Sequence, residues 1–194
     1  MKATLFFIVE VEEDYNNTMK LSNGLEIAVN NSIDDVKHIN RVGRVVDAPK
    51  GALVSKGDLL LFHHNICRQS WGLKGKKRKS NFHIAANQYY IPASEIFMMK
   101  RKDDSDWVAI DPFVFIEPLE AKMVKLSNGF EVEEDSYSGM KDLVGKIAYP
   151  NKELEHNGVE RGDLVAFQQD SQHEYTIDGK LYYKMKTQDV LAVY

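Results

Sequence analysis

Short apolar runs separated by turn-forming residues recur along the whole chain. Each run is rich in branched and aromatic residues and is bounded by Gly, Pro, Asn or Asp, a composition typical of β-strands. In the first half the runs are LFFIVEV (5–11), GRVVDA (43–48), DLLLFHH (58–64) and EIFMMK (95–100). In the second half they are FVFIEP (113–118), GKIAYP (145–150), DLVAFQQ (163–169) and DVLAVY (189–194). No stretch keeps an apolar period of about 3.6 residues long enough to predict a helix, so the pattern predicts an all-β fold.

The chain also contains nearly the same octapeptide twice. KLSNGLEI (20–27) returns as KLSNGFEV (125–132), 105 residues later, and the segments around it follow in the same order. The matching pairs are VGRVV (42–46) with VGKIA (144–148), KGDLLLF (56–62) with RGDLVAF (161–167), and YYIPASEIFMM (89–99) with YYKMKTQDVLAV (182–193). Self-similarity at a long spacing indicates a duplicated structural unit. The spacing falls from 105 to 93 at the tyrosine pairs, so the first copy carries 12 extra residues that include WGLKGKKRKS (71–80).

The two copies predict two small domains joined by a linker. We expect one domain at 1–102, with a basic insertion at about 68–82, and another at 112–194, because the charged segment around 103–111 has no apolar periodicity. Several short strands with turns between them indicate closed or partly closed barrels. The Asp-Gly pair in TIDGKLYY (176–183) predicts a hairpin. The expected fold is therefore all-β, with two tandem small β-barrels.

The composition agrees with two small globular domains and indicates the cellular compartment. A hydrophobic content of 43% and a charged content of 28% are ordinary for globular domains, and the net charge of −4 gives no general attraction to nucleic acid or membranes. The single cysteine, Cys67, rules out an internal disulfide framework and fits a reducing compartment. No apolar run approaches the roughly 18 residues of a membrane span. The start MKATLFFIVEVEED turns acidic too soon for a signal peptide, so we expect a cytoplasmic protein.

The ordered set of segments resembles the GroES-type co-chaperonin, the ten-kilodalton chaperonin family. The second copy carries the resemblance best, in VGKIA, VERGDLVAF, YTIDGKLYYKM and QDVLAVY, and the first copy keeps VGRVV, VSKGDLLLF and YYIPASEIFMM. The resemblance covers nearly the whole chain, and its weight comes from the order of the segments, found twice. It implies two tandem GroES-like barrels, a form that occurs in plastids. Some viruses encode co-chaperonins of this type, and a viral origin would place the protein in the host cytoplasm.

The resemblance implies a lid for a protein-folding cage. Family members form a ring that closes an ATP-dependent GroEL-type chaperonin in its nucleotide-bound state, and client proteins fold inside. Each domain docks through a mobile loop whose apolar triplet follows a Gly. No enzyme activity and no cofactor are implied. The residues that correspond to the docking triplets and their glycines are Gly24, Leu25, Glu26, Ile27, Gly129, Phe130, Glu131 and Val132.

Two interpretations of the octapeptides stay open on the residues alone. Their flanks, NNTMKLSNG (16–24) and DSYSGMK (135–141), are polar and contain Gly, and such segments resist ordering on their own. Two buried apolar side chains contribute roughly 3–6 kcal/mol, so one loop binds weakly and several loops on one ring add up. The alternative is that S-N-G is a plain turn, after which Leu25 and Ile27 enter a strand as core residues. Glu26 and Glu131 depart from the family's apolar triplet.

The resemblance also implies a ring built by strand pairing, which hides exposed strand edges. We expect Ile96–Lys100 to pair with Phe113–Glu117 within one chain, and Val190–Tyr194 to pair with Leu5–Val11 of a neighbour. Two-domain chains supply even numbers of barrels, so we expect homo-oligomers of three or four chains with six or eight barrels. The expected interface residues are Leu5, Phe7, Val9, Val190, Ala192 and Tyr194.

A roof hairpin of the family has no counterpart in the pattern. Family members often carry a hairpin between the G-x-V strand and the x-G-D strand, and it closes the dome. Here APKGALVSKGD (48–58) and YPNKELEHNGVERGD (149–163) leave room for only a short turn. The lid would then have an open centre and a roomier chamber.

Catalytic and metal-binding patterns are weak. His63, His64, Cys67 and His83 are residue types that bind zinc, but the second copy has glutamines and no cysteine at the matching place. No Ser/His/Asp or Cys/His set lies in a catalytic motif, and no G-x-G-x-x-G occurs. The sequence therefore predicts neither an enzyme nor a metal site.

The insertion in the first copy supports an alternative function. Five cations occupy six positions near Trp71 and Phe82, and basic residues interleaved with aromatic ones can bind single-stranded nucleic acid. The alternative is a non-enzymatic β-barrel binding module or virion component that uses this loop for nucleic acid or an acidic partner. A solvated loop is the simpler interpretation and is favoured here over nucleic-acid binding. The cations are Lys74, Lys76, Lys77, Arg78 and Lys79.

Overall fold

A computed structural model describes residues 2–13, 18–21, 23–28, 39–104, 106–125, 130–133, 136–137 and 139–194. The chain divides into two compact units, Met1–Trp107 and Val108–Tyr194. The division falls inside the linker that the sequence predicts at 103–111.

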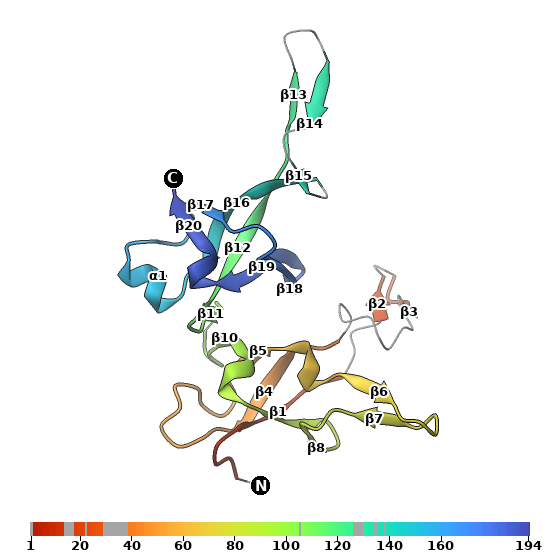
Figure 1. Ribbon diagram of the computed structural model, residues 1–194. Helices are drawn as coiled ribbons and strands as arrows, with labels where there is room; N and C mark the ends of the chain where they lie inside the picture. The colour runs from red at the N-terminus through yellow and green to blue at the C-terminus, as the bar shows by residue number, and fades with distance from the viewer. Residues whose placement is uncertain are drawn as a thin grey trace. The chain divides into compact units, whose positions relative to one another are not determined.

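The regular secondary structure of both units is almost entirely β-strand (Figure 1). The first unit contains β1 Phe7–Glu10, β2 Thr18–Lys20, β3 Glu26–Ala28, β4 Val42–Asp47, β5 Leu59–Phe62, β6 Gln69–Trp71, β7 Lys77–Lys79, β8 His83–Ala85, β9 Gln88–Ile91 and β10 Ile96–Lys100, with short 3-10 helices at His64–Ile66 and Ala93–Glu95. The second unit contains β11 Val108–Ala109, β12 Phe113–Glu120, β13 Met123–Lys125, β14 Glu131–Glu133, β15 Ser136–Tyr137, β16 Met140–Tyr149, α1 Lys152–His156, β17 Leu164–Phe167, β18 His173–Ile177, β19 Lys180–Lys186, a 3-10 helix at Thr187–Asp189 and β20 Val190–Val193. The prediction of an all-β fold is confirmed.

The main sheets of the two units have the same antiparallel strand order. In the first unit the order includes β10-β5-β4-β1-β9-β8, and in the second it reads β20-β17-β16-β12-β19-β18. Strand β1 is central and pairs with β4 and β9, as β12 pairs with β16 and β19. Both orders have two ends, so among the described strands neither sheet closes into a barrel; of the closed or partly closed barrels expected, the closed form is not found. Apolar patterning shows where strands lie, but closure also needs matching tilt and stagger, which the pattern does not contain.

The glycines of VGRVV and VGKIA, Gly43 and Gly145, lie where two strands approach closely. A Cβ added to Gly145 would lie 2.4 Å from a methyl carbon of Ile116 and 2.9 Å from the Glu117 carbonyl oxygen. At Gly43 the added atom would lie 3.2 Å from the carbonyl oxygen of Glu10 in β1 and 3.1 Å from the Phe62 ring. A larger residue would push the central strand away from its neighbour, so the missing side chain allows the close approach in both units.

The G-D turns that lead into β5 and β17 also match in detail. Gly57 and Gly162 both have φ of +98°, a conformation that favours glycine. Their N–H groups donate to Val45 O at 2.8 Å and to Ile147 O at 2.7 Å. The aspartates that follow these glycines, Asp58 and Asp163, differ in their surroundings. Asp58 is 2% exposed and accepts three hydrogen bonds. The donors are Ser55 N at 2.9 Å, Arg101 Nη1 at 3.1 Å and Lys102 N at 3.0 Å.

We predict that Asp58→Asn destabilises the first unit by about 1–3 kcal/mol at pH 7, because it weakens these charge-assisted bonds. Burial raises the pKa of the Asp58 carboxyl, but the three hydrogen bonds outweigh burial and hold the pKa below its ordinary 3.8. A depressed folded-state pKa stabilises the protein above the unfolded-state value and loses this effect as pH falls through the folded-state value. The difference between wild type and variant should therefore shrink below about pH 4.

Urea unfolding followed by tryptophan fluorescence measures this effect, because both tryptophans, Trp71 and Trp107, lie in the first unit. Asp163→Asn, in the matching turn of the second unit, is the control and should leave this transition unchanged. A destabilisation by Asp58→Asn that stays constant from pH 7 to pH 3 would show that the ionised carboxyl is not responsible.

Two local elements illustrate how turn chemistry acts in the second unit. The predicted hairpin at 176–183 is confirmed as β18–β19, with both turn residues, Asp178 and Gly179, at positive φ. Helix α1 was not predicted. Asn151 Oδ1 caps it by accepting from Leu154 N at 3.0 Å, and Leu154 is 5% exposed within the core of the unit.

Among the described residues, no helix combines the length and the apolar character needed to cross a membrane.

Candidate docking surfaces

The first octapeptide forms the end of a two-stranded hairpin, β2–β3. Met19 lies opposite Ile27 in the register, and Lys20 lies opposite Glu26. The turn is closed by Leu21 N, which donates to Leu25 O at 2.8 Å. In the described part of the chain, no third strand joins this pair.

The apolar residues of this hairpin are exposed. Leu25 is 55% exposed and Ile27 is 40% exposed, and Leu21 at 38% lies opposite Leu25. Residues two apart in a strand and opposite each other in a ladder share one face. Leu21, Leu25 and Ile27 therefore form a small apolar face that the protein does not bury. This contradicts the interpretation in which Leu25 and Ile27 enter the core.

Gly24 allows the backbone conformation that the turn before Leu25 requires. Its φ is +82°, and an added Cβ would meet no atom within 4 Å. Its N–H donates to Leu21 O at 2.8 Å, and Asn23 Oδ1 accepts from Leu25 N at 3.0 Å. Asn23 and Gly24 thus lie in a tight turn that presents Leu25 directly after it.

The second octapeptide is also part of a two-stranded hairpin, β13–β14 (Figure 1). Val124 lies opposite Val132 in the register, and Lys125 lies opposite Glu131. Phe130, directly before β14, is 70% exposed. Gly129 lies outside the described residues, as do the side chains of Glu26, Glu131 and Val132. Each copy of the repeat therefore presents a large apolar side chain, Leu25 or Phe130, at a hairpin end.

The predicted ring interface needs two corrections. Strand β1 is hydrogen-bonded on one side to β4 and on the other to β9, so Phe7 and Val9 have no free edge. They are also buried, at 7% and 0% exposed. Strand β12 is likewise paired on both sides, with β19 over Phe113–Ile116 and with β16 from Phe115 onward, so it has no free edge for Ile96–Lys100. The sequence marks both segments as strands, but strand order decides which strands are at the edge.

The last strand of the chain is the free edge among these candidates. Strand β20 is at the end of its sheet and pairs only with β17 in the described residues. Its equivalent in the first unit is β10, which pairs with β5 in the matching register. Phe97 of β10 is 2% exposed, whereas Leu191 at the matching place in β20 is 64% exposed. Val193 and Tyr194 are 47% and 76% exposed, and Ala192 is exposed as well. Val190 is half-buried.

A second apolar patch lies beside the start of β1. Leu5 is 79% exposed and Phe6 is 46% exposed. The Phe6 ring lies 6.5 Å from that of Tyr90, which is 36% exposed. Leu5 therefore remains available as a contact residue, although it precedes the strand that the sequence assigned to it.

The basic insertion is a hairpin, and the expectation of a loop is wrong. Strands β6 and β7 pair with Trp71 opposite Lys77 and Ser70 opposite Arg78. Trp71 is 61% exposed. The strand signal is absent from KKRKS because four of its five residues are cationic, yet strand β7 forms within this segment.

The histidines considered as zinc ligands make separate contacts. His63 Nδ1 accepts from Asn65 N at 3.1 Å, and the His63 and His64 rings lie 4.1 Å apart. His83 Nε2 lies 2.9 Å from Ala86 O, and Cys67 is buried. Within the described residues, no group of three or more His, Cys, Asp and Glu side chains is arranged to hold a metal ion.

No protein-family model matches the chain, and no curated protein matches it.

Proposed function

We propose that the protein is a non-enzymatic co-chaperonin of the GroES type, in which the hairpins β2–β3 and β13–β14 dock on the rim of a GroEL-type chaperonin. The exposure of Leu25 and Phe130 at matching places carries this proposal. Exposed apolar residues are common singly, but the face of Leu21, Leu25 and Ile27 and the equivalent position of Phe130 in the second copy fit surfaces that a partner covers. The tandem resemblance and the shared strand order of the two units support the same proposal.

The energetics of this contact favour many weak sites. Burial of Leu25 with Ile27, or of Phe130 with a neighbour, contributes roughly 3–6 kcal/mol to one docking event. Ordering the flanking residues costs about 1–2 kcal/mol each. One hairpin alone binds weakly, and several hairpins on one ring bind strongly and still release together when the chaperonin changes state. Reversible closure of a folding chamber around a client protein requires this balance.

The ring is proposed to contain three or four chains. Among the described strands, β20 has one unpaired edge, and it carries the exposed side chains of Leu191 and Val193. The patch of Leu5, Phe6 and Tyr90 is the proposed counterpart on the neighbouring copy. A contact between two different surfaces of identical chains closes into a ring when the rotation between copies allows it.

The centre of the proposed lid is open. The segments that would carry a roof hairpin hold no strand pair in either unit, and in the second unit the space is taken by α1. A wider opening suits a bulky client.

Capture by a chaperonin tests this proposal. We predict that a tagged chain pulls down purified bacterial chaperonin in the presence of ATP, or of ADP with a phosphate analogue, and at least about tenfold less without nucleotide. The resemblance implies this dependence, because family members close the chaperonin only in its nucleotide-bound state. Equal capture in both states would indicate nonspecific adhesion, and no capture by any chaperonin tried would reject the proposal.

A further inference from the structure

We propose that the hairpin β6–β7 is a binding element for single-stranded nucleic acid. This inference is independent of chaperonin docking, because it concerns a different hairpin and a different partner. Three features carry it: the local charge, the way in which the hairpin is held, and an exposed indole among the cations.

The charge of the chain is divided unevenly. The first unit has 16 Lys and Arg against 13 Asp and Glu, whereas the second has 9 against 16. Between Asp58 and Glu95 the chain has no carboxylate side chain, and it has six cations there, Arg68 and the five of the insertion. A protein with a net charge of −4 thus concentrates positive charge on one hairpin. A partner with regularly spaced negative charge fits this distribution.

The base of the hairpin is fixed to the body of the unit. Gln69 at the start of β6 is 5% exposed. Ser80 Oγ, just after β7, donates to Ile66 O at 2.5 Å. Lys79 Nζ donates to Ala86 O at 2.9 Å and lies 5.6 Å from the centre of the Tyr89 ring. Lys79 therefore serves the anchor, and the remaining four cations of the insertion lie farther out.

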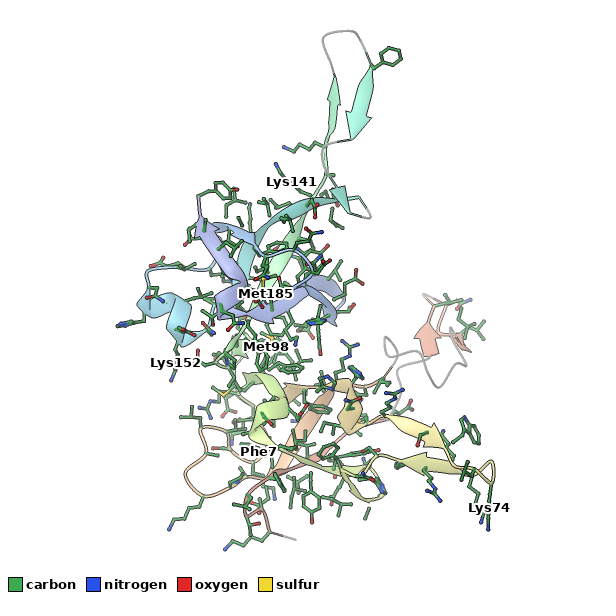
Figure 2. The ribbon with its side chains drawn as sticks, viewed as in Figure 1. Phe7, Lys74, Met98, Lys141, Lys152 and Met185 are labelled. Carbon is green, nitrogen blue, oxygen red and sulfur yellow. The ribbon has the colours of Figure 1, made fainter. Side chains whose placement is uncertain are left out.

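The outer part of the hairpin is accessible to a large partner. Gly72 N donates to Lys76 O, and Gly75 N donates to Gly72 O, both at 2.8 Å, and these bonds close the turn. Figure 2 shows Lys74 at this end of the hairpin, away from the sheet. Leu73 is fully exposed. Arg78 lies across Gly72, where an added Cβ would come within 3.0 Å of its Nε, so the absent side chain leaves space for the guanidinium.

The exposed indole decides between kinds of anionic partner. Trp71 and Lys77 are directly opposite in the register and share one face of the hairpin. A lysine or arginine pairs with a phosphate or with a carboxylate, but an exposed indole beside it also offers a stacking surface for an unpaired base. Bases of a duplex are already stacked and do not reach such a surface. The combination favours single-stranded nucleic acid over a duplex and over an acidic peptide.

Fluorescence anisotropy with labelled dT20 and rU20 tests the proposal on the full chain. We expect a dissociation constant of roughly 1–100 μM at low salt. Four phosphate contacts give a salt slope of about −2.8, so binding should weaken about 50-fold between 50 and 200 mM NaCl. Trp71→Ala should weaken binding about 5- to 150-fold, and Trp71→Phe, which keeps a stacking ring, should weaken it much less.

Charge variants identify the hairpin as the site. Replacing Lys74, Lys76, Lys77 and Arg78 together by glutamine should abolish saturable binding. The control replaces four exposed lysines elsewhere, Lys2, Lys50, Lys56 and Lys152, and should bind normally although its net charge is the same. Unfolding transitions of both variants that match wild type exclude misfolding as the cause.

Three outcomes overturn the proposal. The first is no binding of dT20 or rU20 at 50 mM salt, and the second is an equal loss in the control charge variant. The third is binding of labelled poly-glutamate or of a 20-base-pair duplex that is as strong as binding of dT20 and insensitive to Trp71→Ala. That result would assign the hairpin to an acidic protein surface or to duplex backbone instead.

Discussion

Chaperonin capture should be lost when Leu25 and Phe130 are both replaced by aspartate, and the fold should be unchanged. Each replacement puts a charge where an apolar contact is proposed, which removes about 1.5–3 kcal/mol of burial and adds the cost of desolvating the carboxylate. The loss applies to every docking hairpin of the proposed ring, so the contributions multiply in avidity. Both side chains are more than half exposed, at 55% and 70%, so unfolding free energy should change by less than about 0.5 kcal/mol.

A matched control separates docking from general surface effects. Leu53 lies between β4 and β5 and is 66% exposed, and Leu73 at the end of β6–β7 is fully exposed. Replacing these two leucines by aspartate makes the same change in charge and apolar surface, and nucleotide-dependent capture should persist. The measurement is the amount of chaperonin retained with nucleotide, together with the thermal unfolding midpoint of each variant. If the Leu25/Phe130 variant captures chaperonin normally, docking uses another surface. If the variant unfolds, the two side chains stabilise the fold and the docking assignment is wrong.

Strand positions could be predicted from the sequence because each strand depends on local composition. The runs at 113–118 and 163–169 became β12 and β17, and the Asp-Gly turn at 178–179 became a hairpin. Helix α1 was missed because five residues are too short for an apolar period, and its cap is a single asparagine. Barrel closure and the identity of the edge strands were predicted wrongly, because both depend on the order of strands in the sheet. The sequence of β1 is compatible with an edge strand, yet β1 pairs with β4 on one side and with β9 on the other.

The candidate sites were found to different degrees for similar reasons. Repetition of KLSNG drew attention to the octapeptides, and the structure adds that Leu25 and Phe130 are exposed, which composition cannot decide. The basic insertion was visible as charge, but its hairpin was not, because lysine-rich segments carry no strand signal. The role of Lys79 as an anchor depends on Ala86 and Tyr89, which approach it only in the folded unit.

The free edge at β20 should be required for assembly. Tyr194 N donates to Leu164 O at 2.9 Å, so alternation along the strand points the N–H of Val193 away from β17, towards the open edge. Val193→Pro removes this outward donor and spares the bond to β17, and Leu191→Lys adds a charge to the exposed edge strand. Deletion of Val190–Tyr194 would be a poorer test, because it also removes the strand that covers β17.

Light scattering coupled to size exclusion measures the result. Wild type should have a mass near three or four times 22.2 kDa, and the Leu191→Lys/Val193→Pro variant should run as a monomer of 22.2 kDa. The matched control is Leu53→Lys, which adds the same charge at an exposed leucine outside any strand. This variant should keep the wild-type mass. Because several docking hairpins must act together, the monomeric variant should also lose chaperonin capture while Leu25 and Phe130 are intact. A wild-type chain that is monomeric at micromolar concentration would reject the ring, and a variant that still assembles would assign the interface to another surface.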